Sequence, residues 1–93
     1  MDKRIEFYKK LKNKLKEDTH FPTRYLFKFI VPSNENKVAQ VEKIFDHTGA
    51  VITKTSSKTG KFISISVLVI MKSPDEIVEK YIQAESVEGI ISL

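Results

Sequence analysis

The side chains in this sequence that could perform chemistry are its serines and two histidines. A serine becomes a nucleophile only when a base is held beside it, and neither His20 nor His47 stands at a recognisable motif distance from a serine. The chain also has no Gly-x-Ser-x-Gly elbow and no Walker-type phosphate loop. We therefore expect no catalytic residues and no enzymatic activity.

A metal centre has equally little support from the sequence. Metal ions are held by clustered imidazole, thiolate or carboxylate groups, whereas the two histidines are far apart and the chain contains no cysteine. His47 is expected in the last turn of a helix, where the helix dipole favours a positive charge, and His20 at a joint between two segments. The sequence thus predicts no metal site and no cofactor.

The positive charge of the chain is concentrated at its start. The formal net charge is +4, and residues 1–28 hold nine basic and four acidic side chains, against seven and eight in residues 29–93. Such a segment suits an anionic partner such as nucleic acid, although a solvated charged helix face is the commoner explanation of such a run. The candidate contacts are five lysines: Lys9, Lys10, Lys12, Lys14 and Lys16.

That basic segment is expected to form a helix attached to one folded domain. Apolar side chains recur at helical spacing, at Tyr8, Leu11 and Leu15. This spacing predicts that residues 1–19 form an amphipathic basic helix. Residues 20–93 carry the remaining apolar patterning, and 93 residues with 41% hydrophobic side chains suit a single core. The division predicted is therefore a helix followed by one domain.

No part of the sequence indicates export or membrane insertion. Lysines interrupt every apolar stretch near the start, and the longest apolar run, residues 67–71, is far shorter than the roughly 20 residues of a spanning helix. The lack of cysteine gives no sign of an oxidising compartment. We expect a cytoplasmic protein that does not contact membranes.

Within the domain, strand-like and helix-like segments alternate. Runs rich in β-branched and aromatic residues predict four strands, at 25–31, 50–55, 62–71 and 87–93. Two helices are predicted, at 34–47 and 74–84, from the apolar stripes that follow Asn34 and Ser73-Pro74 in the sequence. Right-handed crossovers then give an α+β fold, the ferredoxin-like βαββαβ plait, with a four-stranded antiparallel sheet and both helices on one face.

Alternation along the strands assigns side chains to the two faces of this sheet. The side chains expected towards the helices are Phe27, Phe29, Val31, Ile63, Ile65, Val67 and Val69. Those expected on the opposite face are Leu26, Lys28, Ile30, Phe62, Ser64, Ser66, Leu68 and Ile70. The opposite face is too apolar to be left bare, so the N-terminal helix, a second subunit or a ligand should cover part of it.

Two turns are candidate ligand or partner sites. Ser33 and Asn34 stand where the first helix of the domain begins, and free amides there suit an anionic group, although simple capping also explains both residues. A hairpin loop with Ser56, Ser57 and Lys58 offers further polar groups, although the lysines of such a loop are most often just soluble turn residues. Lys28, Ser64 and Ser66 are the polar candidates on the open face.

RNA binding is a further possibility for a plait, because RNA-recognition motifs share this fold. Lys58, Phe62 and Ile63 match their third-strand pattern, but Gly60 stands where the second stacking aromatic belongs. The first strand offers Lys28 on the open face rather than an aromatic ring. Nucleic acid is therefore possible but not favoured.

Three segments carry a family resemblance: HFPTRYLFKF at 20–29, TSSKTGKFISISV at 55–67 and VEGIISL at 87–93. Together they resemble the YbeD-like family of small bacterial proteins. The resemblance implies a ferredoxin-like plait similar to ACT-type regulatory domains, no established activity and a suspected regulatory role. It also favours a homodimer, because ACT-type folds commonly associate side by side.

The leading hypothesis is a non-enzymatic regulatory or binding domain that acts through a small effector or a protein partner. Its contact groups would lie at the first strand-helix turn, the hairpin loop, or an edge strand paired with a second subunit. The alternative is nucleic-acid binding through the basic helix and the sheet face.

Overall fold

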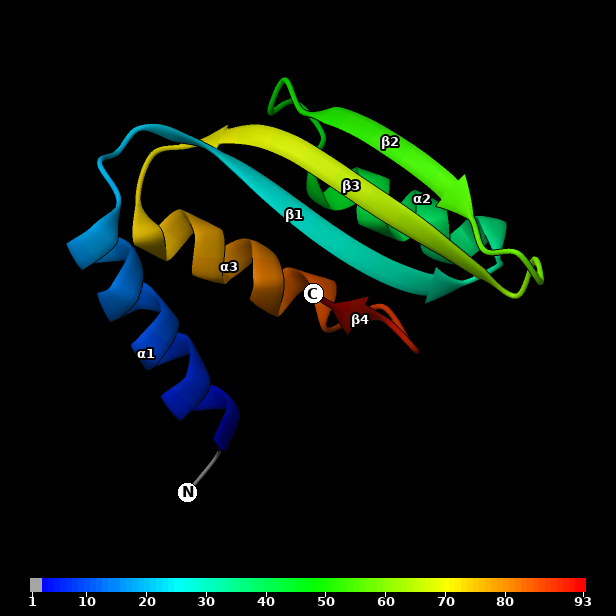
Figure 1. The fold of residues 1–93 in the computed structure, drawn as a ribbon, viewed down its shortest axis with the longest axis horizontal. Coiled ribbons are helices and arrows are strands. Elements are labelled where there is room, and N and C mark those ends of the chain that lie inside the picture. The colour runs from blue at the N-terminus through cyan, green and yellow to red at the C-terminus, as the bar shows by residue number, and fades with distance from the viewer. Residues whose placement is uncertain (1–2) are drawn as a thin grey trace.

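Three helices and four strands follow one another along residues 3–93, the part of the chain that this computed structural model describes (Figure 1). In chain order they are α1 (Lys3–Asp18), β1 (Thr23–Pro32), α2 (Glu35–Ile44), β2 (Val51–Ser56), β3 (Phe62–Met71), α3 (Pro74–Ala84) and β4 (Ile91–Ser92). The predicted order of elements is confirmed.

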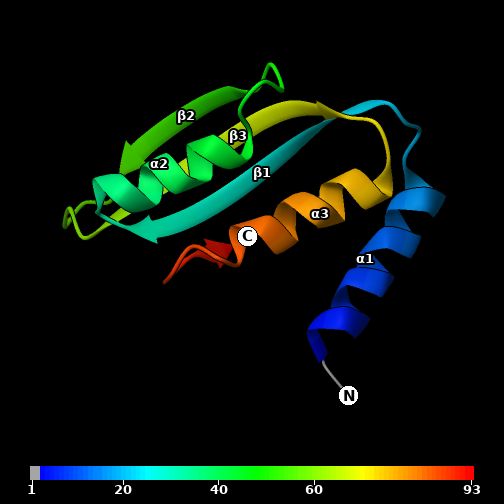
Figure 2. The same ribbon diagram turned by 180° about the vertical axis from the view of Figure 1, so that it is seen from behind.

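The strands form one antiparallel sheet in the order β2-β3-β1-β4. β1 and β3, the segments richest in aromatic and β-branched residues, lie at its centre and pair along their whole length, from Thr23 with Met71 to Pro32 with Phe62. Figure 2 shows α2 and α3 on one face of the sheet, while the other face has no helix over it. The fold is therefore the predicted ferredoxin-like plait.

The core lies between the sheet and these two helices. All but one of the side chains predicted to face the helices are at most 3% exposed, and Ile63 is half-buried. Phe27 is at the centre, with its ring 5.1 Å from that of Tyr81. The Tyr81 hydroxyl lies 2.8 Å from that of Tyr25, and burial together with this contact raises the pKa of Tyr81.

α3 begins where the sequence predicts it. The Ser73 hydroxyl accepts a hydrogen bond from the Glu76 amide at 3.2 Å, and Pro74 occupies the first turn. The helix then buries Ile77 and Ala84 against the sheet. It ends at Ala84, as expected from its apolar stripe.

α2 is shorter than predicted. It ends at Ile44 rather than near residue 47, because Phe45 turns into the core and the Thr48 hydroxyl donates to the Phe45 carbonyl at 2.5 Å. His47 lies after the helix, in a turn, with a φ of 61°. Its predicted place in the last helical turn is wrong.

β4 is much shorter than the predicted strand over residues 87–93. Val87 is buried behind α3, and Gly89 turns the chain with a φ of 80° against the ring of Pro32. Only Ile91 and Ser92 then pair with β1. The apolar pattern of residues 87–93 correctly indicates an ordered segment, but it does not show that most of this segment is a turn.

α1 packs against α3 and leaves the open face of the sheet uncovered (Figure 1). Its side chains Tyr8, Leu11 and Leu15 are partly buried against the core. Arg4 pairs with Glu85 at 2.8 Å, and the Tyr8 hydroxyl donates to the same carboxylate. Partial burial and this carboxylate raise the pKa of Tyr8 to about 12. The N-terminal helix, one of the three predicted covers, therefore does not cover the apolar face of the sheet.

Candidate functional site

Ser33 joins the first strand-helix turn to the hairpin loop. Its hydroxyl donates to the Gly60 carbonyl at 2.6 Å, and its amide donates to the Lys61 carbonyl at 2.9 Å. The bond from the amide continues the ladder between β1 and β3 by one residue pair beyond the strands, and the bond from the hydroxyl ties the turn to Gly60. Both polar groups of Ser33 are thus used within the fold.

Asn34 caps α2 and occupies the amides that an anion would need. Its side-chain oxygen accepts hydrogen bonds from the amides of Asn36 at 2.9 Å and Lys37 at 3.3 Å. An anion at this helix start would have to displace that oxygen. The arrangement favours the capping explanation of Asn34 over the ligand site.

Replacing Asn34 with alanine tests this role. We expect the free energy of unfolding to fall by about 1 kcal/mol, the usual cost of losing an N-cap side chain, as measured by urea denaturation. Asn36→Ala is the matched control, because its side chain is exposed and makes no hydrogen bond within residues 3–93. Equal stability of the Asn34 variant and the wild type would contradict the capping role.

The hairpin loop is also held by its own side chains. The Ser57 hydroxyl accepts from the Phe62 amide at 3.1 Å, and the Ser57 amide donates to the Phe62 carbonyl at 2.8 Å. Lys58 is exposed and forms no ion pair with the described residues. Of the loop candidates, Ser57 is therefore structural, and Lys58 is available to a partner.

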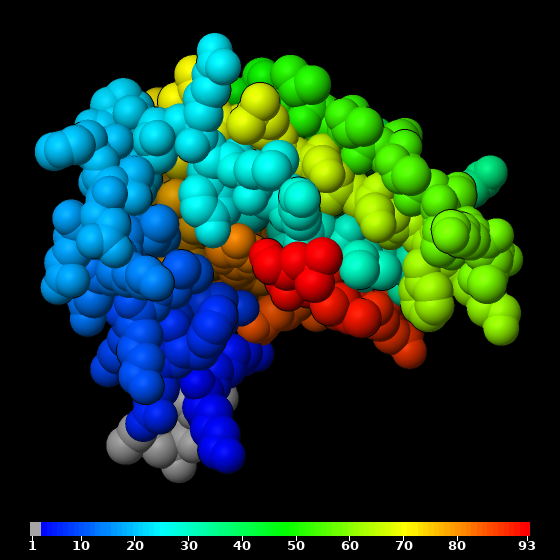
Figure 3. All heavy atoms as spheres, in the orientation of Figure 1, coloured from blue at the N-terminus to red at the C-terminus, as the bar shows by residue number. Residues whose placement is uncertain are grey.

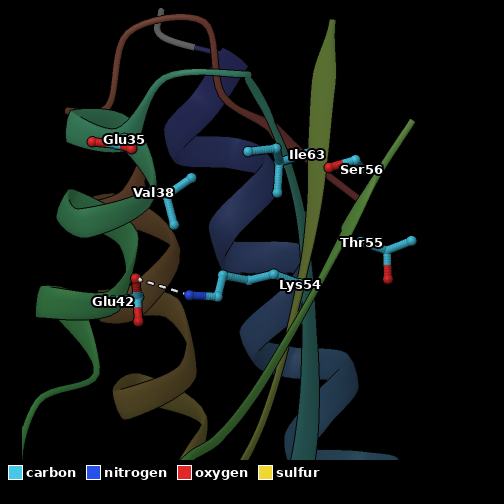
Figure 4. Close-up of a pocket in the computed structure, with 7 residues that line it drawn as sticks. All are labelled: Glu35, Val38, Glu42, Lys54, Thr55, Ser56 and Ile63. Carbon is cyan, nitrogen blue, oxygen red and sulfur yellow. Dashed lines mark ion pairs between the residues drawn. The ribbon is translucent and has the colours of Figure 1, made fainter. Parts of the chain in front are cut away.

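Ser56, the last residue of β2, lines a small pocket between α2 and β2 (Figure 4). The pocket holds about 320 Å³ and is lined by Glu35, Val38, Glu42, Lys54, Thr55, Ser56 and Ile63. Figure 4 shows Lys54 reaching towards Glu42, at 3.5 Å, while Thr55 points away. Sequence reasoning missed this pocket because its charged residues come from a helix and a strand that no local pattern links.

The polar candidates of the open face lie together near the middle of the sheet. Lys28 on β1 is the register partner of Ser66 on β3, which in turn pairs with Thr53 on β2. Ser64 has Thr55 beside it in the same way. The two threonines were missed, although alternation along residues 51–56 carried the signal. The structure thus brings Lys28, Ser64 and Ser66 together, but away from Ser33 and Asn34.

Apolar side chains flank this polar band on both sides. Six of them are exposed, with Val51 at 64% and Ile70 at 59%. On one side of the band lie Leu26, Val51, Leu68 and Ile70, and on the other Ile30, Phe62 and Ile91. We call these residues, with the polar band between them, the open face. It carries six of the ten large hydrophobic side chains that are exposed among residues 3–93.

The basic residues of α1 divide into two groups. Lys12 is paired with Asp75 of α3 at 2.5 Å, and this contact lowers the pKa of Asp75. Lys12 therefore helps to hold α1 in place. The other candidate lysines are exposed and form no ion pair within the described part of the chain: Lys9, Lys10, Lys14 and Lys16.

The described residues form no metal-binding cluster and no membrane-spanning helix. No three His, Asp or Glu side chains of residues 3–93 gather closely enough to hold a metal ion. His20 and His47 are both exposed. Among the helices of the same residues, none is long and apolar enough to cross a membrane.

One comparison with known proteins identifies a family. The family model described as a protein of unknown function, DUF493, matches residues 16–92, which is most of the chain and includes the end of α1. No curated protein and no solved structure matches the chain. The match confirms the resemblance to the YbeD-like family that three segments of the sequence carry. The chain belongs to the DUF493 family of proteins of unknown function.

Proposed function

We propose that this protein is a non-enzymatic binding domain with a regulatory role, and that its partner is another protein held on the open face. The single observation that carries the proposal is the face itself. It is apolar at both ends and polar in the middle, and no helix of residues 3–93 covers it. A monomer rarely leaves such a surface without a partner.

The layout of the open face suits a protein better than a small molecule. Leu68 and Ile70 project from the central strand β3 with 38% and 59% of their surface exposed, and Val51 stands beside Leu68 on β2. Side chains of this kind form the water-excluding centre of protein interfaces. The hydroxyl groups of Ser64 and Ser66 and the Lys28 ammonium would supply hydrogen bonds that fix the register of the partner.

A small effector is supported by one observation, the pocket between α2 and β2. Its volume of about 320 Å³ is near the lower limit for ligand sites. Glu42 offers a negative charge and Lys54 a positive charge to a ligand bound there. An effector there predicts that a zwitterionic ligand such as an amino acid raises the melting temperature. That shift should disappear when Lys54 is replaced with methionine.

Nucleic-acid binding rests on the four exposed candidate lysines of α1, which are Lys9, Lys10, Lys14 and Lys16. It predicts affinity for RNA or DNA that falls steeply with salt, because phosphate contacts release counterions. The open face adds little, since it offers one aromatic ring, Phe62, for base stacking. Protein binding remains the better supported function.

Replacing Leu68 and Ile70 together with lysine tests the proposal. We expect the fold to be retained, because both side chains are exposed, and binding of the partner to weaken by at least about tenfold, as for a lost hot spot. The partner is first trapped with a photo-cross-linker at Ser66, then purified and titrated by calorimetry. If the partner is a second copy of the chain, sedimentation would show a dimer that the variant loses.

Ala39→Lys provides the matched control for charge. Ala39 is exposed on α2, on the opposite side of the domain from the open face. Its variant should bind the partner with wild-type affinity. Wild-type affinity in the Leu68 and Ile70 variant, or equal cross-linking from both sides of the domain, would exclude the open face as the binding surface.

A further inference from the structure

The outer edge of β1 is paired with β4 along only part of its length. β4 reaches as far as Lys28, whose carbonyl accepts a hydrogen bond from the Leu93 amide at 2.9 Å. Alternate residues of a strand point their amide and carbonyl to the same side, so Leu26 and Arg24 face this edge as well. No strand within residues 3–93 pairs with them there.

A groove runs beside this unpaired edge. It holds about 270 Å³, and its walls are mainly aromatic and aliphatic, with Phe7 and Leu11 from α1, Tyr25 from β1, Tyr81 from α3 and Leu93 beyond β4. Figure 3 shows the hollow between blue α1, cyan β1 and the red C-terminal residues, with orange α3 behind it. An extended chain laid in the groove would therefore find apolar surface on its inner side.

Positive charges border the same edge. Arg24 and Lys28 are exposed on the open side of β1 and form no ion pair with the described residues. On α1, Lys10 and Lys14 follow Phe7 and Leu11 at three-residue spacing, so they lie on adjoining parts of the helix. The charge at the edge is complementary to an acidic chain.

We infer that the free edge of β1 binds an extended acidic segment of a partner protein, which adds to the sheet as a strand in line with β4. The backbone of Leu26 and Arg24 supplies the hydrogen bonds. Side chains of the bound strand alternate between the two faces. Apolar ones enter the groove beside Tyr25 and Tyr81, and acidic ones lie beside Arg24 and Lys28.

This edge adjoins the open face and shares Leu26 and Lys28 with it, but the bound segment pairs with the edge of β1 instead of covering that face. The edge is defined by backbone groups and the groove behind them, and neither depends on Leu68 or Ile70. The two surfaces can therefore be tested independently, and failure of one leaves the other standing.

The direct test uses a short capped peptide that alternates valine and glutamate. On adding it to the full-length protein, we expect slower hydrogen exchange at the amides of Arg24 and Leu26, which no strand protects in the free protein. Affinity is measured by fluorescence anisotropy and should fall as salt is raised. The same peptide with lysine in place of glutamate should bind at least about tenfold more weakly.

Two variants at Leu26 separate backbone pairing from side-chain contact. Leu26→Pro removes an amide hydrogen that no described strand uses, and should weaken peptide binding by about tenfold. Leu26→Ala keeps the amide and should stay within about threefold of the wild type. Circular dichroism checks the fold of both variants. A peptide N-methylated on alternate residues, on the side that faces β1, makes the same test without changing the protein.

Several results would overturn the inference. One is unchanged exchange of the Arg24 and Leu26 amides at saturating peptide. Another is equal binding of the methylated and unmethylated peptides, or of the glutamate and lysine peptides. The Leu68 and Ile70 lysine variant should still bind the peptide at the edge, and loss of binding there would place the peptide on the open face instead.

Discussion

Phe27→Ala is expected to lower the free energy of unfolding by about 3–5 kcal/mol, the usual cost of emptying an aromatic site in a core. Phe27 has no exposed surface. Its ring centre lies 4.7 Å from that of Tyr25, 5.0 Å from that of Phe45 and 5.9 Å from that of Phe29. These rings come from β1 and the end of α2, so the cavity would open where sheet and helices meet.

Urea denaturation followed by circular dichroism measures this loss. Leu26→Ala is the matched control, because Leu26 is the next residue on the same strand but is 48% exposed on the open face. It should cost less than about 1 kcal/mol. If Phe27→Ala does not fold, Phe27→Leu gives a smaller, measurable loss in the same direction. Equal losses at the two positions would contradict the assignment of the faces.

Deleting residues 1–18 is expected to lower the free energy of unfolding by about 2–4 kcal/mol. Tyr8, Leu11 and Leu15 are each partly buried against the core, and about 1 kcal/mol is typical for half-burying such a side chain. The exposed ion pair between Lys12 and Asp75 adds little to this sum. The deletion also uncovers part of the groove beside Tyr81.

A charge variant separates packing from electrostatics in this experiment. Replacing Lys9, Lys10 and Lys14 together with glutamine removes exposed charges but keeps every apolar contact of α1. Its melting temperature should match that of the wild type, while the deletion melts several degrees lower. An unchanged melting temperature after the deletion would mean that α1 is a mobile arm rather than a packed element.

The fold could be predicted from the sequence because its strongest signals are local. The two-residue alternation of 25–31 and 62–71 identifies the buried face without any knowledge of the partners. The limits of α2 and β4 could not be found in that way. In the sequence, Phe45 looks like a continuation of the helix and Val87 looks like the start of the strand. Tertiary packing turns both side chains into the core. As a result the helix ends before Phe45, and the strand begins only after Val87.

The position of α1 depends on contacts between residues far apart in the sequence. An apolar stripe at Tyr8, Leu11 and Leu15 shows that the helix packs on something, but the sheet and α3 are equally apolar targets. The choice rests on partners such as Arg4 and Glu85, which are 81 residues apart. No local pattern reveals a pair at that separation.

The candidate site could be predicted only where its residues follow a local pattern. Lys28, Ser64 and Ser66 were placed on one face by alternation alone, and the register of the sheet brings them together. Ser33 and Asn34 were recognised as polar groups at a turn. Whether such groups are free or already bonded depends on Gly60 and on backbone geometry that composition does not record.

The bonds between Ser33 and the hairpin loop also limit where the chain can change length. Because Ser33 holds both Gly60 and Lys61, an insertion after Gly60 would pull the start of α2 out of place. Lys58 and Thr59, at the tip, make no backbone hydrogen bond to another part of the fold. Extra residues, an epitope or a fluorescent label can therefore be accommodated at the tip of this loop without disturbing the sheet.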